Sequence, residues 1–492
     1  MTIFEAYKPF RNKIRQLELF DTLYVLWLKS IYSQFDRPLP NDFKVITRNT
    51  NLKSLSKSEI MLYNGLDHEL DIILIEALKN ADEISSQDKS LKNPNVLRKV
   101  LKDLRDLNNF ITEKNRHKDD IFRSLLRLAH QQFPWQEKLN SHSLIPYYYI
   151  YNDPEVARIV EKVIGLNPFD IFIIGIYYTF RFQKQFFLPK KPVSDRNVVS
   201  TDKLRRFIQE FSIDLDSLRE KVRESHFVDE KYLFMLNPLR ANPIISYGEN
   251  ILSPMPIYIY WAITKGLYYR LCNHNSFGNY YGDSFQKFIG KLLERVINNN
   301  NLKVFSESEY YVGKERKDSV DWIIKDNDEI LFIECKTKRM TRLAKFSIEP
   351  EELERDLNKM SEFLKQTYKT YMDYEKNLYP KLKFDSDLKC RILILTLENW
   401  FIDIDETDYK KLDEQIKHHL PSSVLGRTPY YVQSMPYFIN DIQIINKVGL
   451  KKYFDLFVSN ELQAYKKNFE FKDLFIEDFD EKLLKPLKEN GA

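Results

Sequence analysis

VDWIIKDNDEILFIECK, residues 320–336, is the stretch of sequence that decides the fold. Its two outer runs, 320–325 and 330–336, are rich in the β-branched, aromatic and apolar residues that favour strands. The residues between them, Asp-Asn-Asp-Glu, are of types that favour turns. The pattern predicts a β-hairpin, and a tight hairpin fixes which residues of the two strands lie opposite each other.

This hairpin would place two carboxylates face to face. In its register Asp321 lies across from Glu334, with Cβ atoms about 4.5–5.5 Å apart, and Lys336 follows on the same face because side chains alternate along a strand. Opposed like charges repel unless something offsets them, and Mg²⁺ is a hard cation that binds carboxylate oxygens. We therefore expect Asp321 and Glu334 to hold a divalent ion, with Lys336 beside the water that attacks a phosphodiester.

The spacing of these residues is that of a known nuclease motif. Asp321, then twelve residues, then Glu334-Cys335-Lys336 resembles the active-site signature of the PD-(D/E)XK superfamily, the restriction-endonuclease-like nucleases. The resemblance implies an endonuclease that depends on Mg²⁺ or Mn²⁺, with catalytic residues Asp321, Glu334 and Lys336. It also implies that the backbone carbonyl of Cys335 joins the two carboxylates as a metal ligand.

Other interpretations of the motif remain open. Glu-x-Lys also occurs at Glu315 and Glu470, as expected in a chain with 30% charged residues. The copy at Glu334 differs because it ends an apolar strand with an aspartate across from it. The competing interpretation is an edge hairpin with a solvated charged rim.

The flanking sequence predicts the elements around the hairpin. Apolar residues at helical spacing from Phe285 to Ile297 predict an amphipathic helix opened by Gly282-Asp283-Ser284. We expect a strand at 302–306, a long helix starting at Glu349-Pro350, and a buried strand from Arg391 to Leu397. The order α, β, β, β, α, β is the core order of the same superfamily. The predicted fold is therefore a helix-rich N-terminal region followed by an α/β core, in which helices flank a mixed central sheet.

One position departs from the family pattern. Many relatives carry a glutamate near the start of the first core helix, where this chain has Gln286. An amide can bind an ion directly or through water but adds no charge, so a second ion is less favoured. Glu294 lies almost opposite the apolar stripe of that helix and is interpreted as a solvated residue.

Basic residues follow the second strand of the hairpin. We expect Lys338, Arg339, Arg342 and Lys345 to contact the phosphates of a nucleic acid, which would make binding dependent on salt. The alternative is an ordinary solvated surface. The net charge of +4 permits nucleic-acid binding without requiring it.

The length and composition of the chain predict more than one domain. The 492 residues, 43% of them hydrophobic, are enough for two or more cores. We expect a helical domain at 1–235 for recognition, regulation or oligomerisation, and a connecting segment at 236–279 with a small hairpin near Gly248. The nuclease domain would span 280–492, with residues after Leu397 extending the sheet.

Cysteine usage and hydropathy predict a cytoplasmic protein. Cys272, Cys335 and Cys390 are isolated in the sequence, which fits neither a zinc knuckle nor a disulfide framework. The sequence lacks the pattern of a signal peptide, and its most apolar windows are too short or interrupted to span about 30 Å of hydrocarbon. No membrane association is expected.

The functional prediction is phosphodiester hydrolysis, with DNA favoured over RNA because the superfamily mostly cleaves DNA. By analogy of fold, the setting is bacterial restriction or defence against phage. Two alternatives are the catalytic subunit of a transposition or recombination complex, and a binding or assembly module that kept the fold. One active site per chain would need two chains for a double-strand cut, so a homodimer or a partner protein is expected.

A second, weaker pattern points to RNA cleavage without metal. Arg123 and His130, and again Arg219 and His226, share a spacing that resembles the one found in HEPN ribonucleases. Because that spacing is common in a chain with many arginines, we interpret both histidines as ordinary helix residues.

Overall fold

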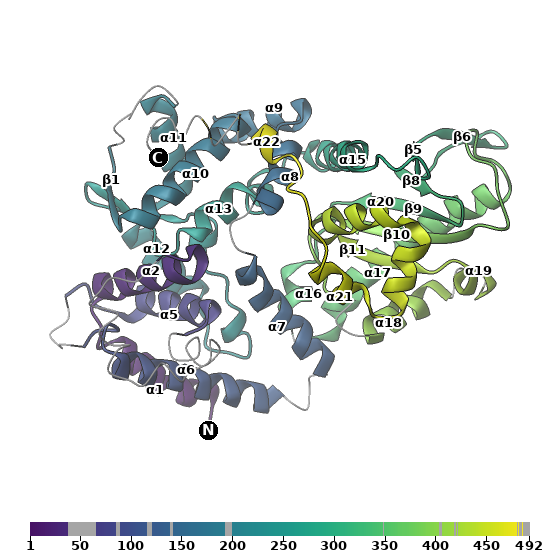
Figure 1. Ribbon diagram of the computed structural model, residues 1–492. Helices are drawn as coiled ribbons and strands as arrows, with labels where there is room; N and C mark the ends of the chain where they lie inside the picture. Colours follow the sequence, from purple (N-terminus) through teal and green to yellow (C-terminus); the bar gives the residue numbers. More distant parts are fainter. Residues whose placement is uncertain are drawn as a thin grey trace.

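The chain forms two lobes of mixed α and β structure (Figure 1). The computed structural model describes residues 1–37, 65–84, 89–115, 121–137, 141–191, 199–347, 349–402, 406–417, 420, 422–479, 481 and 485. The N-terminal lobe is mostly helical, and the C-terminal lobe is built around a five-stranded sheet.

The N-terminal lobe contains twelve α-helices, two short 3-10 helices and four short strands in its described residues. The helices are α1 (Ile3–Ile14), α2 (Leu19–Phe35), α5 (Asp67–Asn80), α6 (Pro94–Asn115), α7 (Ile121–Gln136), α8 (Ser141–Tyr151), α9 (Pro154–Ile164), α10 (Pro168–Lys184), α11 (Thr201–Phe211), α12 (Leu215–Ser225), η2 (Tyr232–Phe234), η3 (Pro238–Arg240), α13 (Ile257–Ile263) and α14 (Leu267–Leu271). The strands are β1 (Phe187–Pro189), β2 (Ser212–Asp214), β3 (Ile244–Tyr247) and β4 (Asn250–Leu252).

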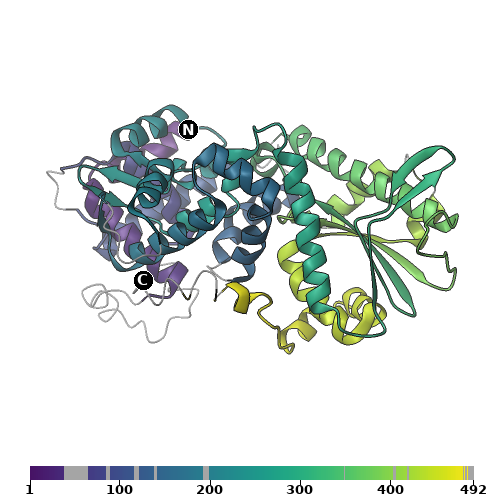
Figure 2. The ribbon, with the colours of Figure 1, turned by 90° about the horizontal axis from the view of Figure 1, so that it is seen from above.

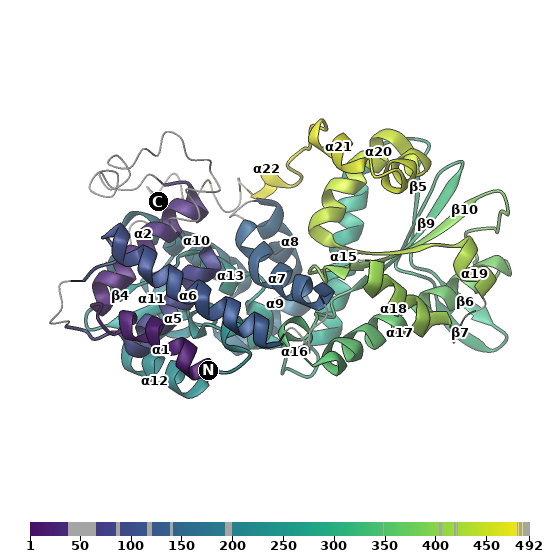
Figure 3. The same cartoon turned by 90° about the horizontal axis from the view of Figure 1, so that it is seen from below.

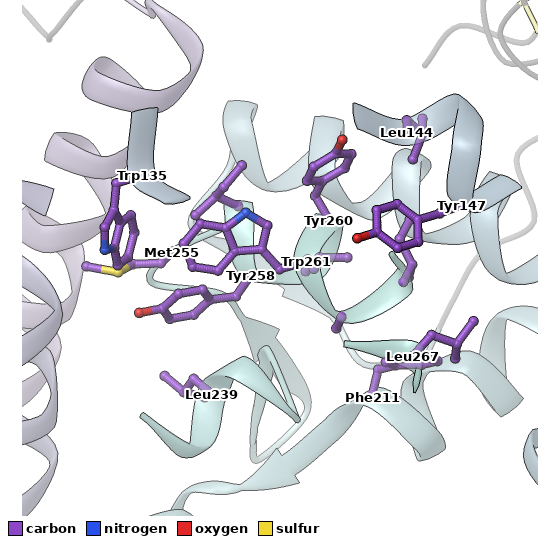
Figure 4. Packing of buried hydrophobic residues seen from close by; sticks show 14 of the residues in the cluster. Trp135, Leu144, Tyr147, Phe211, Leu239, Met255, Tyr258, Tyr260, Trp261 and Leu267 are labelled. Carbon is purple, nitrogen blue, oxygen red and sulfur yellow. The ribbon is translucent and has the colours of Figure 1, made fainter. Parts of the chain in front are cut away.

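The segment expected to connect two domains is instead part of this lobe. The hairpin predicted near Gly248 is present as β3 and β4, but it pairs with β1 and β2 in a sheet of order β1-β4-β3-β2. The following helix, α13, is buried in the core, where Trp261 lies 4.8 Å from the ring of Trp135 on α7 (Figure 4). The region before residue 236 is therefore not purely helical, and residues 236–279 complete its core.

The C-terminal lobe carries the elements predicted around the hairpin, together with several that were not. Its strands are β5 (Lys303–Ser306), β6 (Glu309–Val312), β7 (Glu315–Asp318), β8 (Trp322–Lys325), β9 (Glu329–Lys336), β10 (Lys389–Thr396) and β11 (Tyr430–Ser434). Its helices are α15 (Phe277–Val296), α16 (Arg342–Phe346), α17 (Pro350–Glu375), α18 (Glu406–Lys417), α19 (Ser422–Arg427), α20 (Met435–Val458) and α21 (Leu462–Lys467). The last described helix, α22 (Ile476–Phe479), returns to the N-terminal lobe and packs against α8.

The central sheet is mixed, as predicted. Its order is β11-β10-β9-β8-β5, and β8 runs antiparallel to both β9 and β5. β9, β10 and β11 run parallel to one another. The strands expected at 302–306 and 391–397 are confirmed as β5 and β10 within two residues, and β11 extends the sheet after Leu397. The β6–β7 hairpin and α16 are inserted into the predicted order.

Helices cover both faces of this sheet, with α20 on one side and α17 and α18 on the other (Figure 3). Alternate residues of β9 divide between the two faces: Leu331 and Ile333 join the core beneath α15 and α20, and Ile330 and Phe332 join the core beneath α17. Glu334 and Lys336 continue the second set and belong to the α17 face.

Helix α15 begins earlier than predicted and lies between the lobes (Figure 2). Gly282-Asp283-Ser284 does not open it, because Phe277 and Tyr281 extend the buried stripe by a further turn and the helix starts at Phe277. The Ser284 hydroxyl donates to the carbonyl of Ile150 on α8, 2.9 Å away. The helix therefore packs against the N-terminal lobe and the sheet at once.

Candidate active site

The hairpin has the predicted register. Lys325 pairs with Ile330, and Trp322 pairs with Ile333. The turn is short because the Asp326 amide donates to the Glu329 carbonyl, 3.0 Å away, which places Glu329 at the start of β9 rather than in the loop. The Asp326 carboxylate also accepts the Glu329 amide at 2.7 Å, and this bond stabilises the turn.

Asp321 lies one residue beyond the last pair of this ladder, at the position opposite Glu334. Its carboxylate accepts the backbone amide of Cys335 at 2.6 Å. Its carbonyl accepts the amide of Glu307, which follows β5, at 2.8 Å. Bonds to both neighbouring strands thus hold Asp321 beside β9, although it is not part of β8.

Lys336 completes a compact group with the two carboxylates. Its ammonium donates to Glu334 at 2.5 Å and lies 5.2 Å from the centre of the Phe363 ring on α17. Burial opposes the charge of Lys336, but Glu334 and then Asp321 outweigh it and raise the pKa of the ammonium. Lys336 is therefore protonated at neutral pH, which suits stabilisation of negative charge better than removal of a proton.

Asp321 is the titrating group of this site. Burial, followed by the negative charge of Glu334, raises the pKa of Asp321 to about 7. Bonding to the Cys335 amide and the charge of Lys336 act in the opposite direction without cancelling the rise. A divalent cation would remove the repulsion that disfavours the ionised carboxylate.

Binding of Mn²⁺ is expected to weaken about tenfold for each pH unit below about 7, because a proton and the ion compete for Asp321. Calorimetric titration between about pH 5.5 and about pH 8 measures this. In the ion-free protein the folded state holds a proton that the unfolded chain has lost, so this carboxyl makes the fold less stable as pH rises from about 4 to 7. If the affinity for Mn²⁺ did not change between these pH values, the assignment of Asp321 as a ligand would be contradicted.

Gln286, the possible further metal ligand, contacts a carboxylate outside the predicted site. Its side-chain amide donates to Glu307 at 3.0 Å, and its backbone carbonyl accepts a hydrogen bond from the Trp322 indole N–H at 3.2 Å. These contacts place Gln286 at the edge of the site, next to the first residue of β8, which directly follows Asp321. Glu307 was not predicted, although continuing the β5–β8 register places it opposite Asp321. Its charge contributes to the raised pKa of Asp321.

The four basic residues expected to contact phosphate lie near the junction of the two lobes. The prediction for Arg339 is wrong, because this side chain is buried, donates to the Lys265 carbonyl at 2.7 Å and lies 3.1 Å from Glu398. Lys338 lies 3.6 Å from Asp356 and is partly exposed. Arg342 is exposed, and Lys345 is partly exposed.

The arginine–histidine pairs have structural partners. Arg123 donates to the carbonyls of Ser347 and Glu349, and His130 packs edge-on against Phe401 at 4.8 Å. In the second pair, Arg219 donates to the Ala81 carbonyl, and His226 lies 3.1 Å from the buried Glu76. These contacts agree with a structural role for both pairs. His130 is a helix residue, as interpreted, whereas His226 lies one residue beyond the end of α12.

The ligands available at Asp321 and Glu334 are those that suit Mg²⁺ or Mn²⁺. Among the described residues, no group of three or more His, Cys, Asp or Glu side chains is placed to share a metal ion. An ion here would have two side-chain carboxylates, a backbone carbonyl and water, and Mg²⁺ commonly keeps several waters in this way.

The three cysteines are not bonded to one another. In the part of the chain that is described, no helix has both the length and the apolar character needed to cross a bilayer. Comparisons of the chain with protein-family models, curated proteins and solved structures find no match.

Proposed function

We propose that this chain is a metal-dependent nuclease that hydrolyses phosphodiester bonds. The observation that carries the proposal is the convergence of Asp321, Glu334 and Lys336 at one end of the β8–β9 hairpin, with the pKa of Asp321 raised to about 7. The order α15, β5, β8, β9, α17, β10, into which β6, β7 and α16 are inserted, supports it, because this is the order expected from the resemblance to PD-(D/E)XK nucleases.

Each residue of the site has a distinct role in this proposal. Asp321, Glu334 and the carbonyl of Cys335 would hold Mg²⁺ or Mn²⁺, which supplies a nucleophilic water and neutralises charge on the phosphate. Lys336, which is protonated, stabilises the negative charge that develops on the phosphate oxygens. Gln286 holds Glu307 beside Asp321 and adds a polar group through which water can be bound.

The substrate and the biological setting rest on the resemblance alone. DNA is proposed over RNA, with restriction or phage defence in the cytoplasm as the setting. A homodimer or a partner protein would supply the second cut of a duplex. The neutral Gln286 favours a second candidate function, a nucleic-acid-binding or assembly module with weak catalysis.

Incubation of the purified protein with plasmid DNA and Mg²⁺ or Mn²⁺ is expected to give nicked or linear product. The product should be lost with a chelator and in Asp321→Asn, because the amide cannot supply the anionic ligand. Asp328→Asn is the matched control, because Asp328 is an exposed aspartate at the turn of the same hairpin.

Three outcomes separate the candidate functions. Cleavage by the wild type that survives in Asp321→Asn would contradict the assigned site. Absence of cleavage in every metal would favour the binding module. Cleavage that appears only after a second protein is added would favour the subunit of a transposition or recombination complex.

A further inference from the structure

Positive side chains from both lobes gather near the ends of β9 and β10, where the Leu397 amide donates to the carbonyl of Lys336 at 3.2 Å. We define the junction cluster as Lys265, Arg339, Lys345 and Glu398. Lys265 lies in the N-terminal lobe between α13 and α14, and Lys345 lies on α16. Arg339 is three residues beyond Lys336, and Glu398 follows β10, so the cluster lies next to the segments that leave the parallel strands.

Arg339 is the fixed centre of the cluster. Its guanidinium lies 3.1 Å from Glu398, donates to the Lys265 carbonyl at 2.7 Å and lies over the Tyr268 ring at 4.1 Å. Its side chain is 5% exposed, which excludes it from direct contact with a large ligand. Arg339 therefore links the segment after β9 to the N-terminal lobe. Its ion pair with Glu398 uses the negative charge of that carboxylate.

Lys345 is left with a charge that the cluster does not balance. Lys265 has a carboxylate at 3.6 Å, that of Glu137, and Glu398 is shared with Arg339. Within the described residues, no carboxylate lies at ion-pair distance from the Lys345 ammonium. The cluster, Glu137 and the Lys338–Asp356 pair together hold four cations and three carboxylates, so one positive charge remains in a partly buried place.

The surroundings of Lys345 confirm that this charge is costly. Burial lowers the pKa of Lys345, and the positive charges of Arg339 and Lys265 lower it further, against the opposing effects of Glu398 and Asp356. The charge of Lys345 also reaches His130, whose Nε2 is buried without a hydrogen-bond partner among the described residues. A partly buried ammonium with no partner is unfavourable unless an anion binds to it.

We propose that the junction cluster binds a phosphate group of the nucleic-acid strand that enters the Asp321–Glu334 site, an inference that rests on the proposed function. Lys345 makes the direct contact, Lys265 supports it from the other lobe, and Arg339 is a positioning residue. The phosphate supplies the missing negative charge, and it belongs to the same strand as the phosphodiester that lies at Asp321 and Glu334. Both lobes thus hold one strand.

The test measures binding of a duplex oligonucleotide in the Asp321→Asn background, where cleavage is blocked, over a range of salt concentrations. Lys345→Met is expected to weaken binding about tenfold and to reduce the slope of log affinity against log salt by about one. Lys345→Arg should keep the slope, because it keeps the charge. Lys221→Met, an exposed lysine on α12, is the matched control and should leave both quantities unchanged.

A second arm uses inorganic phosphate, measured by the rise in melting temperature of the wild type and of Lys345→Met. Stabilisation of the wild type alone, with competition between phosphate and the oligonucleotide, supports the proposal. Stabilisation by phosphate with an unchanged salt slope in Lys345→Met would mean that the site takes free phosphate, and would overturn the proposed strand contact. No effect of Lys345→Met in either arm would overturn the anion site itself.

The two arms also separate this inference from the proposed function. A protein that is stabilised by phosphate through Lys345 but neither binds nor cleaves an oligonucleotide would keep the anion site and overturn its assignment to a nucleic-acid strand. A nuclease whose Lys345→Met variant binds and cuts normally would keep the function and overturn the inference.

Discussion

Replacement of Lys336 by methionine is expected to lower the rate of phosphodiester cleavage by about 10²–10⁴-fold. Methionine can keep the packing on Phe363 but lacks the ammonium that donates to Glu334. The loss should appear in single-turnover measurements at saturating Mn²⁺. Binding of Mn²⁺ should persist, because both carboxylates remain.

Lys359→Met is the matched control for this prediction. Lys359 also lies over the Phe363 ring, at 5.6 Å, but on α17 and paired with Glu362. The control removes a lysine from the same ring without touching the two carboxylates, so its cleavage rate should match the wild type. A Lys336→Met protein that cleaves within a few-fold of the wild type would rule out a role for the ammonium.

Replacement of Arg391 by methionine is expected to destabilise the C-terminal lobe by about 3–5 kcal/mol, because it leaves a buried carboxylate without its partner. Arg391 and Glu329 are 2% and 4% exposed and are joined by two bonds of 2.6 and 3.1 Å across β10 and β9. The guanidinium also donates to Tyr431 and lies over Phe454. Urea denaturation followed by circular dichroism measures the loss.

The double variant Arg391→Met/Glu329→Gln distinguishes a lost ion pair from lost packing. Because the double variant also removes the unpaired negative charge of Glu329, it should recover a substantial part of the stability lost in Arg391→Met. Equal stability of the single and double variants would mean that contacts of the guanidinium with Phe454 and Tyr431 dominate.

The part of the site that local rules govern could be predicted from the sequence. Residues 320–336 contain both strands and their turn, so the pairing of Trp322 with Ile333 follows from hydrophobic alternation and a short loop. The same alternation predicts that Glu334 and Lys336 share a face, and their hydrogen bond confirms it.

Features that depend on distant partners could not be predicted. Arg339 has the sequence context of a surface residue, but the carboxylate that pairs with it comes from Glu398, which follows two helices and a strand. The β6–β7 hairpin has mostly polar residues and lacks the apolar alternation that marks a strand; Arg316 and Glu309 pair across it. The role of Glu307 depends on the register between β5 and β8, which the sequence does not encode locally.

Because helix α15 packs against both lobes, the C-terminal lobe is not expected to fold as an independent domain. A polypeptide begun at residue 280, where the sequence predicts a domain boundary, would lose the first turn of this helix and leave Tyr281 without its aromatic neighbour Tyr151. Arg339 would lose the Lys265 carbonyl as well. The C-terminal half is thus not a unit that can be excised or exchanged, and a different N-terminal half would support it only by rebuilding the surface on which α15 packs.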